Sequence, residues 1–341
     1  MSLVSQITSD VVLSRQGVED AYKRIVPHVK RTPVLTNASL SALATGHEHA
    51  QPTTLYFKCE NFQKGGAFKI RGATHALSKL SPDQLQHGVI THSSGNHAQA
   101  LSIAAREKNC KAYIVMPSNS AKPKVAATKG YGGEVHFSGP SAQEREAVTA
   151  TIQARTGANL IPPYDHADII LGQGTVVLEL LEQTADSGGL DAIIVPVGGG
   201  GLLAGSALAA QGSGVRVFGA EPELADDCYR GLQVGKRIVT SNTATVADGL
   251  RTPVGTINFP IIQRHVDKVF TVSEQEIINA MRLVWERLKI VIEPSSAVVV
   301  AVVLSQKWKD EGVKGKVGLV ISGGNVDLST VGELFTRLPK E

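Results

Sequence analysis

The sequence is poor in cysteine, in aromatic residues and in excess charge. Its three cysteines, Cys59, Cys110 and Cys228, lie far apart and form no C-x-x-C pair. This spacing excludes a disulfide framework and a cysteine-rich zinc site, and it indicates a reducing compartment. Aromatic residues make up 5% of the chain, and 34 basic residues oppose 31 acidic ones. That surplus is too small to make nucleic acid or an anionic membrane the main partner.

Long hydrophobic runs are also missing. The longest strongly apolar run, residues 297–304, falls far short of the ~18 residues that a membrane-spanning helix needs. The N-terminal segment carries Asp10 within its apolar part and lacks a basic start, which argues against a signal peptide. We therefore expect a soluble, cytoplasmic protein.

Glycine, in contrast, is abundant. It supplies 34 of 341 residues, about a tenth of the chain against a usual share of roughly 7%. This favours loops whose backbone approaches a ligand closely. The hydrophobic fraction of 42% and the charged fraction of 19% are those of a globular protein. A chain of 341 residues is long enough for two domains, since a domain takes ~100–200 residues.

Short β-branched runs alternate with helical stretches along most of the chain. We expect strands at 89–91, 112–116, 134–137, 191–197, 215–220 and 316–321, and helices at 96–108, 122–129, 141–156, 202–210 and 273–289. Ser141 with Glu144, and Ser273 with Glu276, form capping boxes at two helix starts. Continuous apolar strands between helices predict twisted, parallel-rich sheets with helices on both faces, and two such sets predict an α/β fold with two lobes.

Four consecutive glycines follow the expected strand at 191–197. Their backbone N–H groups converge at a helix start, where the helix dipole favours an anion, so we interpret residues 198–201 as a phosphate-binding loop. The same segment satisfies G-x-G-x-x-A through Gly199, Gly201 and Ala204, and Glu221 follows where a ribose-binding acidic residue is expected. On these residues alone, an NAD-dependent oxidoreductase and a non-catalytic nucleotide-binding module remain alternatives.

Two segments in the N-terminal half place reactive side chains beside glycines. In ENFQKGGAFKIRGA, Lys69 has an aromatic neighbour and nearby glycines. A lysine desolvated in this way has a lowered pKa and can form a Schiff base, whereas the alternative is an ordinary surface lysine. In THSSGNHAQA, Ser94 and Asn96 lie where a strand passes into a helix and can donate to a ligand; the alternative is that they only cap the helix.

Two segments in the C-terminal half also carry candidate ligands. In VISGGNVDLS, Ser322 follows a buried strand and precedes two glycines, and an ordinary turn is the alternative. In AEPELADDCYR, Glu221, Asp226 and Asp227 crowd one loop. Carboxylate oxygens at this spacing suit a hard cation such as Mg²⁺ or Ca²⁺, whereas the alternative is that they cap the following helix.

Taken in order, GAFKIRGA, SSGNHAQ, VGGGG and SGGN resemble the fold-type II pyridoxal-phosphate enzymes, and within them the serine racemase group of the serine/threonine dehydratase family. The resemblance runs from residue 32 to residue 327. It implies a tryptophan synthase β-like fold, with a large cofactor-binding domain at 1–79 and 161–341 and a small mobile domain at 80–160. It also implies that the cofactor phosphate lies where a dinucleotide would place its pyrophosphate.

The resemblance assigns roles to individual residues. It implies that Lys69 carries pyridoxal 5′-phosphate covalently, that Phe68 lies against its ring, that Asn96 binds its 3′ oxygen and that Ser322 binds its pyridine nitrogen. The phosphate is expected at Gly198, Gly199, Gly200, Gly201 and Leu202, and the substrate at Ser93, Ser94, Gly95, Asn96 and His97. Glu221, the Ala225 carbonyl and Asp227 match the Mg²⁺ (or Ca²⁺ or Mn²⁺) ligands of the group. Lys64, Gln99, Tyr131 and Asn325 stand where its members bind ATP.

The implied activity is interconversion of L- and D-serine, with β-elimination of serine to pyruvate and ammonia. Lys69 would act as the base on one face of the substrate and Ser94 on the other. Ser94 stands where threonine deaminases of the family carry alanine, yet 3-hydroxyaspartate dehydratases share the serine. A dehydratase of L-threonine, L-serine or threo-3-hydroxyaspartate is therefore the alternative. We expect a small amino-acid substrate, a homodimer, and neither a nucleic acid nor a membrane as partner.

Overall fold

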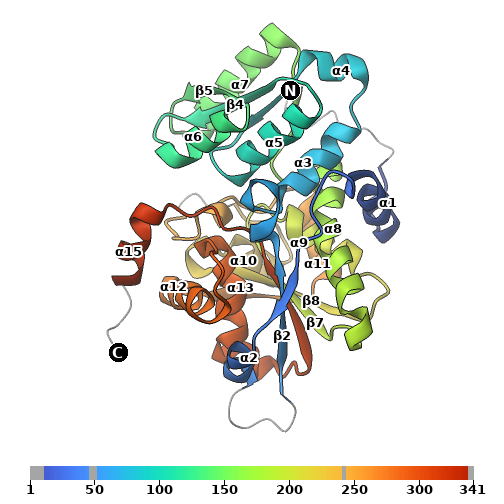
Figure 1. Cartoon of the computed structure of the whole chain (residues 1–341), viewed down its shortest axis with the longest axis vertical. Coiled ribbons are helices and arrows are strands. Elements are labelled where there is room, and N and C mark those ends of the chain that lie inside the picture. The colour runs from blue at the N-terminus through green and yellow to red at the C-terminus, as the bar shows by residue number, and fades with distance from the viewer. Residues whose placement is uncertain (1–10, 46–51, 240–242, 337–341) are drawn as a thin grey trace.

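A computed structural model describes residues 11–45, 52–239 and 243–336, and these form two β-sheets flanked by helices (Figure 1). The large sheet has the order β1 (Val34–Thr36), β2 (Thr54–Cys59), β10 (Lys316–Ile321), β7 (Ala192–Pro196), β8 (Arg216–Pro222) and β9 (Lys268–Val272). In it, β1 runs antiparallel to β2 and the other neighbouring strands run parallel. The small sheet, β5 (Glu134–Ser138), β4 (Ala112–Pro117), β3 (Val89–His92) and β6 (Asn159–Leu160), is parallel.

Helices cover both faces of the large sheet, because its central strands are apolar on both sides. One face carries α2 (Ala38–Thr45), α12 (Glu274–Leu283), α13 (Pro294–Leu304), α14 (Gln306–Glu311) and α15 (Leu328–Thr336). The other carries α1 (Arg15–Ile25), α8 (Ala167–Thr184), α9 (Gly201–Ala209), α10 (Asp227–Val234) and α11 (Asn258–His265). The aromatic rings of Phe218, Phe270 and Trp308 pack together on the first face.

The small sheet has its own helices. On one face α3 (Lys69–Ser78) and α5 (Asn96–Glu107) share a core with the strands, and α7 (Ala142–Thr156) packs on the other face. α6 (Lys122–Gly130) contacts α5 and β5, and α4 (Pro82–His87) lies near β6. α3 also packs on α8 of the large sheet, so it lies at the junction of the two layers (Figure 1). Pro162 and Pro163 lie between β6 of the small sheet and α8, which packs on the large sheet.

The expected α/β class is confirmed, as are both capping boxes, at α7 and at α12. One expected helix differs in detail. The helix predicted over 273–289 is α-helical only to Leu283 and continues as a π-helical turn, Val284–Leu288, before Lys289 adopts φ 60°. Cys59, Cys110 and Cys228 are free thiols, in agreement with their spacing. Among the described helices, none combines the length and the apolar character that crossing a bilayer requires.

Candidate active site

Lys69 begins α3 at the junction of the two sheets. The preceding residue, Phe68, is the N-cap of the helix, and its N–H donates to the Ser322 carbonyl at 3.0 Å. The Lys69 amine donates to the Pro163 carbonyl at 2.7 Å and lies 5.2 Å from the centre of the Phe68 ring. Burial lowers the pKa of this amine to about 8, while the Glu293 carboxylate opposes the shift. Lys69 is thus a partly buried lysine with a backbone partner, unlike an ordinary surface lysine.

Tyr164, the residue after Pro163, packs against the glycine loop at 198–201. A Cβ atom at Gly199 would lie 2.2 Å from Cγ of Tyr164, and one at Gly201 would lie 2.9 Å from the Tyr164 carbonyl oxygen. Gly200, the N-cap of α9, has φ 87°, a conformation that favours glycine. The first N–H groups of a helix have no partner within it, so this loop forms a cradle that suits an anionic group.

Residues 93–97 connect β3 to α5. The N-cap of α5 is Gly95 and no side chain caps this helix, so the alternative that Ser94 or Asn96 serves only as a cap is wrong. Asn96 begins α5, and its amide nitrogen donates to the Glu293 carboxylate at 2.8 Å. His97 is buried, with Nε2 3.1 Å from the Ile161 carbonyl. Burial and the nearby Lys69 lower the pKa of His97 to about 3, so its ring is neutral.

Sequence reasoning missed Glu293, which joins these loops. It precedes Pro294 at the start of α13, and the residue is 3% exposed. The Asn96 side-chain oxygen accepts from Asn325, and Asn325 also donates to the Gly65 carbonyl, so a chain of amides runs from Glu293 to the loop before Lys69. Burial, then the carboxylate of Asp248, raises the pKa of Glu293 to about 7. The available signal was a glutamate directly before a helix-starting proline.

Ser322 also has a partner that the sequence did not reveal. Its hydroxyl lies 3.0 Å from that of Ser296 in α13, and both side chains are buried. Ser296 in turn donates to the Gly323 carbonyl at 2.6 Å and accepts from the Gly323 N–H at 2.7 Å. Ser322 is thus held at the end of β10, close to the Phe68 backbone.

The acidic segment from the end of β8 to the start of α10 buries two carboxylates, those of Glu221 and Asp227. Glu221 accepts from the N–H groups of Cys228 and Tyr229 at 3.1 and 2.8 Å, in the first turn of α10, as the helix-capping alternative predicts. Asp227 accepts from the Val254 N–H at 2.8 Å. Burial, then the neighbouring Asp227 carboxylate, raises the pKa of Glu221 well above its ordinary value. The described residues contain no group of three or more His, Cys, Asp or Glu side chains arranged to hold a metal ion.

The four residues expected at a nucleotide site have different surroundings. Lys64 forms an ion pair with Glu107 at 2.6 Å, and Gln99 is buried within α5. Tyr131 follows α6 and packs on the core of the small sheet. Asn325, as described above, belongs to the amide chain that reaches Asn96.

Fold and site together define a two-sheet α/β protein whose desolvated lysine amine lies near a glycine-lined cradle for an anion. A family model described as "Pyridoxal-phosphate dependent enzyme" matches residues 25–323, and the chain belongs to this family. This membership replaces the alternatives of an NAD-dependent oxidoreductase and of a nucleotide-binding module.

Three known proteins illustrate the relationship. A serine racemase of Dictyostelium discoideum is 47% identical over 94% of this chain and 97% of its own length. An L-threo-3-hydroxyaspartate ammonia-lyase of Saccharomyces cerevisiae is 44% identical over 96% of this chain and 97% of its own. The solved structure of maize serine racemase superposes with a TM-score of 0.88, at 42% identity over 95% of this chain and 97% of that one.

Proposed function

We propose that this chain is a pyridoxal-phosphate-dependent serine racemase that also eliminates water from serine. The observation that carries the proposal is the Lys69 amine, which is desolvated between the two sheets and hydrogen-bonded to Pro163, the chain neighbour of the Tyr164 that packs on the glycine cradle. Relatives named serine racemase, at 47% and 42% identity over nearly the whole chain, support serine as the substrate.

The residues at the site fit the cofactor. Lys69 would hold it covalently, Phe68 would lie against its ring, and Ser322 would bind its pyridine nitrogen with support from Ser296. The crowded glycine turn at 198–201, in which Gly200 has a positive φ, and Leu202 would hold the phosphate through N–H groups, and Asn96 would bind the 3′ oxygen. When bound, pyridoxal phosphate supplies a conjugated ring that accepts the electrons left when a proton leaves the substrate Cα.

Racemisation requires a proton-transferring group on each face of the substrate. With a pKa of about 8, about a tenth of the Lys69 amine is unprotonated at pH 7 and can take a proton. Ser94 directly precedes the N-cap of α5, so its hydroxyl would lie near the positive end of the helix dipole, which favours negative charge. We assign Ser94 to the second face, and the loop of Ser93, Gly95 and His97 to the substrate carboxylate.

Elimination is expected alongside racemisation because of Ser322. A neutral hydroxyl does not hold a proton on the pyridine nitrogen as a carboxylate would. With Ser322 as its partner, bound pyridoxal phosphate would supply a weaker electron-withdrawing ring, and this would favour loss of the substrate β-hydroxyl group. The products would be pyruvate and ammonia.

A second candidate is a 3-hydroxyaspartate dehydratase. The yeast L-threo-3-hydroxyaspartate ammonia-lyase and a Paracoccus denitrificans β-hydroxyaspartate dehydratase are each 44% identical to this chain, a level similar to that of the racemases. A dehydratase of L-threonine or L-serine with little racemisation belongs to the same alternative. These activities differ in product, so one assay separates them.

Further features of the proposed enzyme follow the same resemblance. Glu221, Asp227 and the Ala225 carbonyl would bind Mg²⁺, Ca²⁺ or Mn²⁺, since a divalent cation relieves the repulsion of two buried carboxylates. Residues 80–160, which hold the small sheet, would close as a mobile domain over the substrate. A cytoplasmic homodimer that responds to ATP at Lys64, Gln99, Tyr131 and Asn325 completes the proposal.

Two measurements test the proposal. Borohydride reduction followed by peptide mass spectrometry should find the cofactor on Lys69, and an adduct on any other lysine overturns the assignment. Chiral analysis of L-serine, together with keto-acid release from serine, threonine and 3-hydroxyaspartate, should show D-serine and pyruvate. Release of keto acid from 3-hydroxyaspartate without any D-serine would establish the dehydratase instead.

The variant Ser94→Ala tests the two-face mechanism. It should abolish racemisation while part of the L-serine elimination survives, because Lys69 still serves its own face. Ser118→Ala, an exposed serine in the small sheet's loops, should change neither activity. Equal loss of both activities in Ser94→Ala would refute the face assignment.

A further inference from the structure

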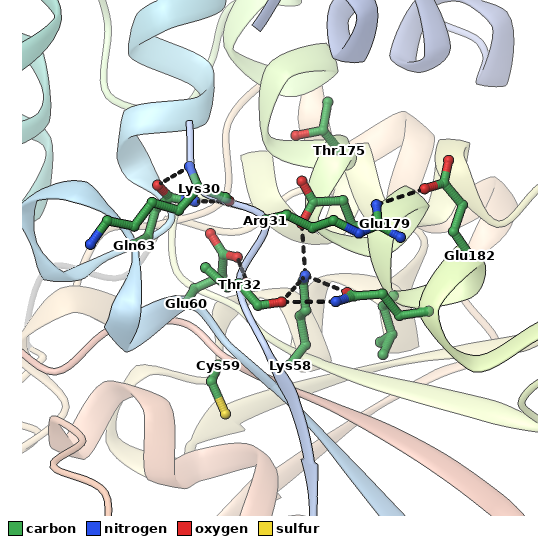
Figure 2. A network of polar contacts seen from close by, with 12 residues as sticks. Lys30, Arg31, Thr32, Lys58, Cys59, Glu60, Gln63, Thr175, Glu179 and Glu182 are labelled. Atoms are coloured by element: carbon green, nitrogen blue, oxygen red, sulfur yellow. Dashed lines mark hydrogen bonds and ion pairs between the residues drawn. The ribbon is translucent and has the colours of Figure 1, made fainter. Parts of the chain in front are cut away.

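Four charged side chains lie completely out of solvent behind the Lys69 loop. Lys58 of β2, Glu60, Arg71 of α3 and Glu179 of α8 have side chains that are 0% exposed. Figure 2 shows Lys58, Glu60 and Glu179 gathered around Thr32. Two cations and two anions balance in this cluster, yet ions are costly to bury unless their geometry satisfies every donor and acceptor. The proposed chemistry uses none of the four.

Arg71 is the centre of the cluster, and all five of its N–H groups have acceptors. Nε and Nη2 donate to the two oxygens of Glu60, each at 2.8 Å. Nη1 and Nη2 donate to the two oxygens of Glu179 at 2.9 and 2.8 Å. The remaining Nη1 proton faces the hydroxyl of Thr175 at 3.3 Å. Only a planar guanidinium can make two bidentate pairs at once, so lysine cannot replace it here.

The Glu60–Arg71 pair closes a loop that contains Lys69. Between these two ends the chain turns through Gly65 and Gly66, both with φ near 70°. Thr32 fixes one end by donating to Glu60 at 2.6 Å. Glu179 fixes the other end against α8, where the Lys58 amine also holds it at 2.7 Å. In the middle of the loop, the side-chain amide of Gln63 accepts from the Lys30 N–H and donates to the Lys30 carbonyl.

Resting on the proposed role of Lys69, we propose that this ion-paired clasp of Glu60, Arg71 and Glu179 is the device that keeps the Lys69 amine against the Pro163 carbonyl. Arg71 is then a positioning residue, since it lies two residues beyond Lys69, on the first turn of the same helix. Because Glu179 on α8 binds Arg71 through two hydrogen bonds, the start of α3 can occupy only one position along the helix axis. An apolar contact of equal size would allow sliding.

The clasp makes a prediction about the amine itself. The groups that face Lys69 are the Pro163 carbonyl, the carboxylate of Glu293, the N-cap of α13, and the neutral His97 on α5. Desolvation is the largest influence on the pKa of Lys69 and lowers it from 10.5 to about 8. If the clasp loosens, the amine becomes better solvated and its pKa returns toward 10.5.

The experiment measures the rate at which an amine-acylating reagent labels Lys69 in the cofactor-free full-length protein, as a function of pH, by peptide mass spectrometry. Arg71→Lys keeps the positive charge but cannot form the two bidentate pairs. Glu60→Gln keeps the shape of the side chain but removes its negative charge. Both should move the labelling midpoint upward, with about tenfold less neutral amine at pH 7 for each unit moved. Arg31→Lys, the same exchange at the exposed pair with Glu182, is the matched control and should match the wild type.

Thr32→Val serves as the gentler variant, since it removes one hydroxyl donor and leaves all four charges in place. It should move the midpoint in the same direction by less, and it decides the question if the charge variants do not fold. Folded Arg71→Lys or Glu60→Gln protein with the wild-type midpoint overturns the clasp, as does an unchanged midpoint in Thr32→Val when it alone folds. Labelling needs no cofactor, so it can support the clasp even if borohydride trapping on Lys69 fails.

Discussion

Replacing Glu293 by glutamine should remove a pH dependence from the stability of the protein. Burial first, and the Asp248 carboxylate second, raise the pKa of Glu293 from 4.5 to about 7, while Lys124 opposes the shift. The folded chain therefore holds this proton more tightly than the unfolded chain does. The resulting stabilisation is fully present below pH 4.5 and is lost as the pH rises to about 7.

The size of the effect follows from the two pKa values. The interval from 4.5 to about 7, at about 1.4 kcal/mol for each pH unit, corresponds to about 3 kcal/mol. Above pH 7 this contribution no longer changes, because the carboxyl group is ionised in both states. Glutamine does not titrate, and its amide oxygen can still accept the hydrogen bond from Asn96.

Urea unfolding of the cofactor-free full chain at several values between about pH 4.5 and about pH 8 measures this difference. The wild type should lose about 3 kcal/mol more than Glu293→Gln across the interval. Glu333→Gln, at an exposed position of α15, should follow the wild type. In infrared spectra, the band of a protonated carboxyl group should titrate near neutral pH and be missing from Glu293→Gln. Identical pH slopes for the variant and the wild type would refute the reasoning.

Two further predictions concern the glycine cradle and the acidic loop. Gly199→Ala would bring a Cβ within 2.2 Å of the Tyr164 ring, so we expect at least about a tenfold loss of cofactor affinity in an absorbance titration. Gly130→Ala, where a Cβ meets nothing within 4 Å, should bind normally. Asp227→Asn removes one of the two buried carboxylates, so Mg²⁺ should raise the unfolding temperature of the wild type but not of this variant. An equal rise in both would place the cation elsewhere.

Local patterns in the sequence predicted the architecture well where they were complete. Ser141 and Ser273 each have a glutamate three residues on, and both form the expected capping boxes. The central strands of both sheets are apolar runs and were found near their predicted bounds. β1, β2, β6 and β9 were missed: Lys58 interrupts β2, and β1 and β6 have only three and two residues. Lys58 can be buried in this strand because Glu179, which is distant in sequence, pairs with its charge.

The site shows the same limit. Lys69 and the glycine loop could be recognised because their neighbours in sequence carry the signal. Glu293 and Ser296 could not, since their importance comes from side chains on other elements, Asn96 and Ser322. The buried charge cluster was invisible for the same reason: nothing local distinguishes Arg71 from a solvated arginine.

The order of strands in the large sheet has a consequence for biosynthesis. β10, at residues 316–321, lies between β2 and β7. While this strand is still inside the ribosome, the nascent chain therefore lacks a central strand of the large sheet. The small sheet uses only strands within 89–160 and can assemble while translation continues. Ser322, the backbone partner of the Lys69 loop, directly follows β10. A messenger RNA truncated before the β10 codons should therefore yield a chain whose small sheet is folded but whose Lys69 site is incomplete.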